Sequence, residues 1–318
     1  MPTYDYEYPI DQCDVAPAQH ESLKACREFR QKCLDDLFGD SDTSVATQLH
    51  ALAWHSAVFK MLNEARRLEP ERAVNGALWE LAACGYASLM TVGIRKLVDA
   101  DKRSNSVSNV LNYVECNLKL MTRENFVCFD GIPYDYEAVQ QTEWPSTDWK
   151  EPGVRWMANK GPQAWRTSEM MHQAFDVLSG VNKKEDRTRA DSVQPELLKK
   201  LRDSLSDSSI ESVRKLVNKV IAHANRSATG KDVFADVTYN QIDQAFEKIV
   251  RVASCVSALF YNAGFGNVLA TPQFDVFENL DAPWASKPTM PLLQNYWDTL
   301  SSSMESWTSG TSLDFIAP

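Results

Sequence analysis

The residues with the clearest chemical potential lie in one short stretch, Val217 to Arg226, which reads Val-Asn-Lys-Val-Ile-Ala-His-Ala-Asn-Arg. It contains one histidine, His223, with Lys219 four residues before it and Arg226 three residues after it. Residues three or four apart share a helix face, so both cations can lie beside the imidazole. Histidine exchanges protons near neutral pH, and His223, Asn218, Lys219 and Arg226 are therefore the candidate catalytic residues.

The helix that precedes His223 places this residue at the boundary between core and solvent. Its apolar residues repeat every three or four positions: Ile210, Val213, Val217 and Val220. At about 100° per residue, His223 lies about 60° from Val220, beside the buried stripe. The polar sequence 225–230 predicts that the helix ends just after His223, where its dipole stabilises an imidazolium. Two interpretations remain open: a proton-transfer group, or a histidine that completes a helix end in a noncatalytic protein.

The segment around this histidine is basic, although the chain as a whole is acidic. Residues 182–231 contain twelve Lys or Arg and seven Asp or Glu, a local charge of +5, whereas the 318 residues together carry −10. The overall charge argues against a protein whose whole surface binds nucleic acid or an anionic membrane. A local basic surface attracts phosphate, although solvated helix faces carry similar runs of charge. Any contact with RNA is therefore expected to be local.

The rest of the chain predicts an all-α fold. Apolar residues recur at helical spacing, and caps or helix breakers bound the runs. The expected helices cover about residues 21–38, 44–69, 77–98, 106–121, 164–178, 194–205, 207–223, 238–264 and 292–307. The last-but-one of these opens with Thr-Tyr-Asn-Gln, which has the form of a capping box. The helix 77–98 is rich in small residues, including Gly85 and Gly93, and is expected at the centre of the bundle, where helices approach closely.

A pair of opposite charges lies near the end of the helix 77–98. Arg95 and Asp99 are four residues apart, so they share one helix face. The simplest expectation is an intrahelical ion pair, which contributes a few tenths of a kcal/mol to stability.

Residues 123–163 interrupt the helical pattern. Aromatic residues alternate irregularly with turn formers there, without a period of two or 3.6. An irregular insertion is therefore expected. Its aromatics could stack bases, or they could anchor the loop to the bundle, and the second role is the commoner one: Tyr134, Tyr136, Trp144, Trp149 and Trp156.

The domain organisation follows from these elements. Residues 1–20 form a polar N-terminal arm, 21–264 a single helical bundle and 265–318 a C-terminal extension that is expected to pack on the bundle. The N-terminus lacks the basic and apolar regions of a signal peptide, and no segment reaches the roughly 18 uninterrupted apolar residues of a membrane span. A soluble, cytoplasmic protein without a membrane partner is expected.

Several other chemistries find no support in the sequence. The seven cysteines are an odd and scattered set, so no disulfide framework is expected. The remaining histidines and the cysteines lack metal-ligand spacing, and no Gly-x-Ser-x-Gly nucleophile motif occurs. We therefore expect neither a metal nor another cofactor.

The stretch Asn-Lys-Val-Ile-Ala-His at 218–223 resembles the HEPN superfamily, and its abortive-infection-type members in particular. The segments 93–99 and 106–111 are similar to these families too, and the resemblance spans about residues 45–262. It implies an all-α bundle, frequent homodimerisation and, in many members, metal-independent cleavage of RNA. The sequence is thus interpreted as an HEPN-like, RNA-directed protein of a prokaryotic defence or toxin–antitoxin type system.

The resemblance is incomplete at one position. In active members an arginine, usually beside a polar residue, precedes the histidine by four to six residues and stabilises charge on the phosphorane. Asn218 and His223 match the polar residue and the histidine, but Val217 occupies the arginine position. Lys219 is the better substitute, although it lacks the bidentate guanidinium, because Arg214 falls on the opposite helix face. The alternative function is a noncatalytic module that acts through dimerisation or a cognate partner protein.

Overall fold

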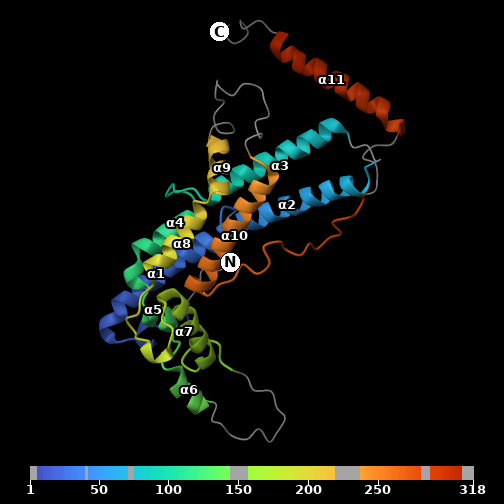
Figure 1. Cartoon of the computed structure of the whole chain (residues 1–318). Helices are drawn as coiled ribbons and strands as arrows, with labels where there is room; N and C mark the ends of the chain where they lie inside the picture. The colour runs from blue at the N-terminus through green and yellow to red at the C-terminus, as the bar shows by residue number, and fades with distance from the viewer. Residues whose placement is uncertain are drawn as a thin grey trace, which may run out of the picture. The chain divides into compact units, whose positions relative to one another are not determined.

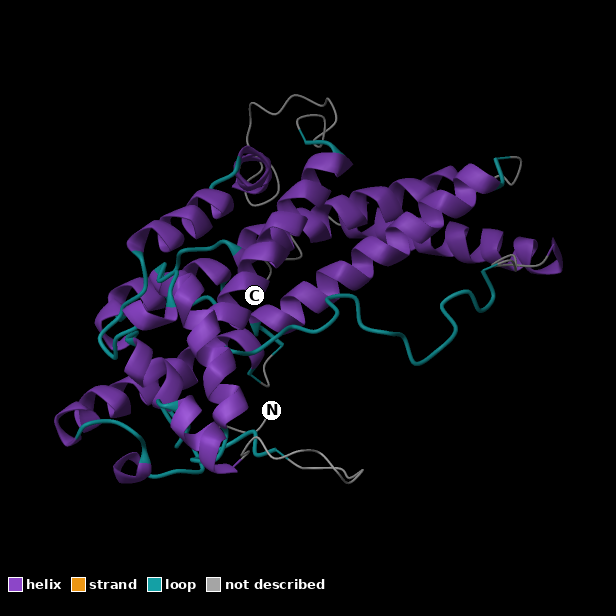
Figure 2. Ribbon diagram, turned by 60° about the horizontal axis from the view of Figure 1, so that its bottom comes forward, coloured by secondary structure: helices purple, strands orange, loops and turns teal. Residues whose placement is uncertain are grey.

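The computed structural model describes residues 6–39, 42–70, 75–143, 157–218, 237–280 and 287–309. The chain divides into two compact units, residues 1–270 and 271–318, which are described separately. The first contains α1 (His20–Phe38), α2 (Val45–Leu68), α3 (Gly76–Leu97), α4 (Val107–Cys116), α5 (Arg123–Cys128), α6 (Tyr136–Glu143), α7 (Trp165–Ser179), α8 (Pro195–Leu205), α9 (Ser208–Leu216) and α10 (Tyr239–Tyr261). The described residues form no strand, so the all-α prediction is confirmed (Figures 1 and 2).

The helices begin where the sequence supplies capping side chains. The Oγ of Ser44 accepts a hydrogen bond from the Thr47 N–H at the start of α2. Thr238 and Gln241 exchange hydrogen bonds at the start of α10, which confirms the capping box. Each such cap satisfies backbone donors that the first helical turn leaves open.

The core of the first unit is organised around α10. One face of this helix is buried along its length and packs against α9, α3, α8, α7 and α4. The buried residues are Ile242, Ala245, Phe246, Ile249, Val252, Ala253, Val256, Ser257, Phe260 and Tyr261. The helix ends at Asn262, which adopts a left-handed conformation with φ 49°, two residues before the predicted glycine. Tertiary packing of this stripe therefore holds together helices that are distant in the sequence.

The helix α3 is central only in its second half. A Cβ on Gly93 would lie 2.5 Å from Leu52 Cδ2, so this glycine lets α3 and α2 approach closely, as expected. By contrast, Gly85 faces open space, and Leu78 and Leu81 are exposed. The expectation that α3 is central throughout is thus wrong for its first turns. Gly76–Leu97 is also long and apolar enough to cross a membrane, but a core helix of a soluble protein has the same composition.

The segment 123–163 is more helical than predicted. It contains α5 and α6, where an irregular loop was expected. Every residue of α5 is buried, so it shows no alternation of apolar and polar faces, and its helical period is invisible in the sequence. Tyr134 and Tyr136 both pack against the ring of His172, which supports an anchoring role for these two aromatics. Trp144, Trp149 and Trp156 lie outside the described residues.

A buried guanidinium joins α5 to α7 and to the segment after it. The side chain of Arg123 is fully buried, and its Nε donates to Asp191 Oδ2 at 2.7 Å. Its Nη1 lies 2.9 Å from Asp176 Oδ1 and donates to the His172 carbonyl at 3.1 Å. Its Nη2 donates to Ser179 Oγ at 3.2 Å. Arg123 is therefore satisfied on all sides, as a buried charge must be.

The neighbouring His172 is held neutral. Its side chain is buried, and Nε2 lies 2.9 Å from the Tyr134 carbonyl, so Nε2 carries the hydrogen. Burial is the main reason that the pKa of His172 is lowered to about 4; the Tyr134 carbonyl opposes this shift, and Arg123 and Arg187 add to it. A second proton is therefore excluded at neutral pH.

Stability should consequently fall between pH 6.5 and 4. The unfolded chain takes up a proton on residue 172 in this window and the folded chain does not, so the free energy of unfolding loses about 3 kcal/mol on acidification. Urea unfolding across this range should show a shallower pH dependence in His172→Gln than in the wild type. The same substitution at the exposed His55 should leave the dependence unchanged. Equal slopes in wild type and His172→Gln would contradict the assignment.

The two ends of the chain differ in how they are held. Tyr8 donates its backbone N–H to Asp130 Oδ1 at 3.0 Å, and Cys13 is buried, so the described part of the N-terminal arm is fixed to the bundle. The second unit contains α11 (Met290–Ser309), which carries exposed Leu292 and Trp297. The packing of the C-terminal extension on the bundle stays a prediction. All seven cysteines are free thiols.

Candidate functional site

The candidate site begins on α9, the short helix that leads into the histidine stretch. Asp207 caps its start by accepting the Ser209 N–H at 2.9 Å. Hydrogen bonds from Lys248 and Ser209 hold the pKa of the Asp207 carboxyl below its usual range. The buried face comprises Ser209, Ile210, Val213 and Leu216 and packs against α10 and α3. The path of the chain up to residue 218 is thus fixed by core packing.

Val217 belongs to this core. It is 3% exposed, which agrees with its predicted place in the buried stripe. The position at which an arginine was expected by resemblance is therefore turned away from solvent. Neither a phosphate nor a solvated guanidinium reaches it here, because burying an unpaired charge is costly. An arginine side chain at position 217 would point into the core and could not reach a phosphate without a change in the packing of this helix.

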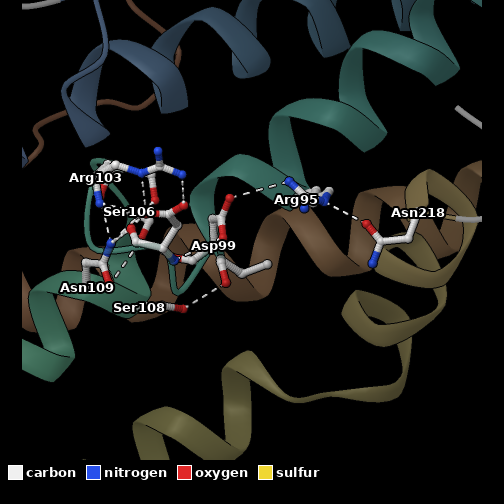
Figure 3. Close-up of polar contacts among 10 residues, drawn as sticks. Arg95, Asp99, Arg103, Ser106, Ser108, Asn109 and Asn218 are labelled. Carbon is white, nitrogen blue, oxygen red and sulfur yellow. Dashed lines mark hydrogen bonds and ion pairs between the residues drawn. The ribbon is translucent and has the colours of Figure 1, made fainter. Parts of the chain in front are cut away.

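Asn218, by contrast, is exposed and contacts another helix. Its Oδ1 accepts a hydrogen bond of 2.8 Å from the Nε of Arg95, on α3 (Figure 3). These residues are 123 positions apart in the sequence. The structure therefore places a guanidinium beside the one candidate catalytic residue that it describes. Lys219, His223 and Arg226 lie outside the described residues.

Arg95 also makes the intrahelical contact that its spacing predicts. Its Nη1 lies 3.4 Å from Asp99 Oδ2, and the side chains are 39% and 28% exposed. The predicted ion pair is confirmed, but it is long and partly solvated, so its contribution to stability is small. Arg95 thus bridges Asp99 on one side and Asn218 on the other.

The loop after α3 is stabilised by a dense set of hydrogen bonds. The Ser106 Oγ donates to the Asp99 carbonyl at 2.5 Å and accepts from the Asn109 N–H at 3.1 Å (Figure 3). The buried Asn109 amide donates to the carbonyls of Asp101 and Ser104. Arg103 donates hydrogen bonds to both oxygens of the Asp101 carboxylate and so lowers the pKa of Asp101. Asp99, and with it Arg95, is consequently held in place from the loop side.

The basic character of the surrounding segment is partly neutralised. Five of its cations contact carboxylates: Lys184 with Glu137, Arg187 with Asp176, Arg189 with Glu124, Arg202 with Glu115 and Arg214 with Glu211. Lys183, Lys199, Lys200 and Lys215 are exposed and have no ion-pair partner among the described residues. Of these, Lys215 lies three residues before Asn218 and so shares its helix face. The free positive charge next to the site is therefore smaller than the sequence count indicates.

Metal-ligating side chains do not gather in the described ranges. No group of three or more His, Cys, Asp or Glu is placed to hold an ion there.

The first unit is an all-helical bundle in the described residues, and Asn218 precedes His223 by five residues in the sequence, as the resemblance to HEPN proteins implies. Residues 34–279 match the HEPN family of AbiU2, and the chain belongs to this abortive-infection family. The match is wider than the expected range of 45–262 and confirms the resemblance. No curated protein and no solved structure matches the chain.

One feature of the site was missed from the sequence. The pairing of Arg95 with Asn218 joins two helices, and no periodicity in either segment encodes it. The available signal was the resemblance itself, which covered both 93–99 and 218–223. Two short segments that resemble one family are candidates for meeting in the fold.

Proposed function

We propose that this protein is a metal-independent endoribonuclease of an abortive-infection system, acting in the cytoplasm through His223. The observation that carries the proposal is Asn218: it is exposed, hydrogen-bonded to a guanidinium, and five residues before His223 in a member of the AbiU2 HEPN family. A histidine can transfer the protons, and an amide and cations can stabilise the phosphate charge, in phosphodiester cleavage without a metal.

The proposed reaction is an internal transfer on RNA. The 2′-oxygen forms a bond to the adjacent phosphorus while the bond from phosphorus to the 5′-oxygen breaks. A base removes the 2′-hydroxyl proton, and an acid gives a proton to the leaving 5′-oxygen. His223 serves these proton transfers, and Asn218, Lys219 and Arg226 bind the phosphate. The products carry a 2′,3′-cyclic phosphate and a 5′-hydroxyl.

The test is incubation of the purified protein with structured RNA in EDTA. We expect cleavage that persists in the chelator, products with cyclic phosphate ends, and no cleavage where a 2′-deoxynucleotide replaces the scissile one. Cleavage that requires a divalent metal, or products with other ends, would contradict the proposed chemistry.

The second candidate is a noncatalytic module that works through dimerisation or a cognate protein. The observation in its favour is the buried Val217 in the motif position where catalysis requires an arginine. It predicts a stable dimer or complex whose function is unaffected by His223→Ala. A monomer at micromolar concentration with ribonuclease activity would refute it.

A further inference from the structure

Phosphodiester cleavage uses a group that the arginine position of the motif, before His223, does not supply. Charge accumulates on the phosphoryl oxygens as the 2′-oxygen attacks, and a guanidinium stabilises it best because its N–H groups match two oxygens at once. Val217 is aliphatic and buried, and a lysine provides charge without the fork. Arg226 follows His223 in the sequence, so a guanidinium that takes the place of the missing one before His223 has to come from another part of the chain.

Arg95 has the donors for this role. A guanidinium carries five N–H groups, of which Nε–H goes to Asn218 and one on Nη1 points to Asp99. The contact with Asp99 is long, and Nη2 has no partner within the described residues. The edge formed by Nη1 and Nη2 can therefore donate hydrogen bonds to two oxygens of a phosphate while Nε stays bonded to Asn218. At 39% exposure, the side chain is reachable from solvent.

Arg95 is also held in position before any ligand binds. The adjacent Ile94 and Leu97 are fully buried, so the last turn of α3 is anchored in the core. Asp99 and Asn218 hold the guanidinium from two sides, and the Ser106 hydrogen bond fixes the backbone at Asp99. A preorganised donor stabilises developing charge at little reorganisation cost.

Two other arginines, Arg103 after α3 and Arg202 on α8, already bind both oxygens of a carboxylate. Arg103 binds both oxygens of Asp101, through Nε at 3.0 Å and Nη2 at 2.6 Å. Arg202 binds both oxygens of Glu115 and also donates to Asn112 Oδ1 at 2.7 Å. A phosphate would have to displace a carboxylate from either of them. Arg214, one helical turn before Asn218, contacts Glu211 through Nη1 at 2.5 Å, whereas the carboxylate contact of Arg95 is 3.4 Å long. Of these four arginines, Arg95 is the one that donates to Asn218.

We propose that Arg95, on α3, supplies the phosphate-binding guanidinium that Val217 lacks, with Asp99 as its positioning residue and with its Nε bonded to Asn218, the neighbouring phosphate ligand. This inference rests on the proposed function, because it assigns a further residue to the same reaction. It divides the site between two segments that are distant in the sequence: α3, which carries Arg95, and the end of the α9 segment, which carries Asn218.

The test compares Arg95→Gln with the matched control Arg202→Gln. Arg202 is 35% exposed and, like Arg95, contacts one Asn amide and one carboxylate. Its carboxylate contact is the closer and bidentate one, so the control removes at least as much structure as Arg95→Gln does. Single-turnover cleavage of structured RNA in EDTA should fall about 100-fold in Arg95→Gln, the effect of removing one preorganised charge donor. It should be unchanged in Arg202→Gln. Arg95→Lys should cleave at an intermediate rate, because it keeps the charge without the fork.

Binding provides a readout that a purely structural role would not move. With a single-stranded RNA carrying 2′-O-methyl groups, which cannot be cleaved, Arg95→Gln should reduce the slope of log K against log salt by about 0.7, the value for one phosphate contact. Thermal unfolding should be similar in Arg95→Gln and Arg202→Gln.

The outcomes separate this inference from the proposed function. Wild-type cleavage that Arg95→Gln and Arg202→Gln leave equal would overturn the role of Arg95 alone. A wild type that neither cleaves nor binds RNA would overturn the proposed function, and the inference with it. If the wild type binds RNA without cleaving it, the slope of log K against log salt tests the contact between Arg95 and phosphate. An unchanged slope in Arg95→Gln refutes this contact, and a reduced slope supports it.

Discussion

Replacing Arg123 with methionine is expected to lower the free energy of unfolding by about 3–5 kcal/mol, the cost of removing one partner from a buried ion pair. The side chain of Arg123 is fully buried and contacts carboxylates from two places, Asp176 on α7 and Asp191 after it. Methionine matches the length of the apolar stem but donates no hydrogen bond. Asp191 then loses its buried partner, and the His172 carbonyl loses the donor that reaches it.

The size of this effect depends on burial and not on the number of ion pairs. Arg202→Met serves as the control, because Arg202 also forms an ion pair with a carboxylate, that of Glu115, but is 35% exposed. Exposed pairs contribute about 0–1 kcal/mol, so the control should lose at most that amount. Urea unfolding with a common m-value measures both. Equal losses in Arg123→Met and Arg202→Met would show that Arg123 does not hold the bundle together.

The fold could be predicted where the signals are local. Ser44 and Thr238 occupy the N-cap positions of α2 and α10, and such caps act within one helical turn. The apolar stripe of α10 was evident because one face of this helix is solvated. In α5, however, every residue is buried, and a pattern that depends on contrast between two faces disappears. The burial of Arg123 was likewise invisible, since its partners come from α7 and the segment after it.

The site could be predicted only in part, for a similar reason. The histidine stretch is contiguous, and its resemblance to the HEPN superfamily pointed to His223 and Asn218. The contact from Arg95 to Asn218 depends on how α3 packs against α9, and that is a property of the whole bundle. The same packing buries Val217. In this packing, the motif position of the arginine is a buried valine, and the guanidinium beside Asn218 comes from Arg95 on another helix.

Histidine is the group on which the proposed chemistry depends most. Replacing His223 with alanine is expected to lower single-turnover cleavage of structured RNA in EDTA by about 10²–10⁴-fold, the usual contribution of a positioned acid or base. The loss should lie in the chemical step, because the imidazole moves protons whereas cations and amides bind the phosphate. Affinity for an RNA with 2′-O-methyl groups should therefore remain unchanged.

Two comparisons make this result specific. His55→Ala, at an exposed position of α2, should cleave like the wild type, which excludes a general effect of losing a histidine. Arg95→Gln should weaken both binding and cleavage, whereas His223→Ala affects cleavage alone, because the two residues are assigned different parts of the reaction. Identical RNA cleavage products from wild type and His223→Ala would contradict the catalytic assignment of His223. If the His223→Ala variant then still forms a dimer or a complex with a partner protein, the protein would be the noncatalytic module. Its function would depend on the binding surface and not on proton transfer.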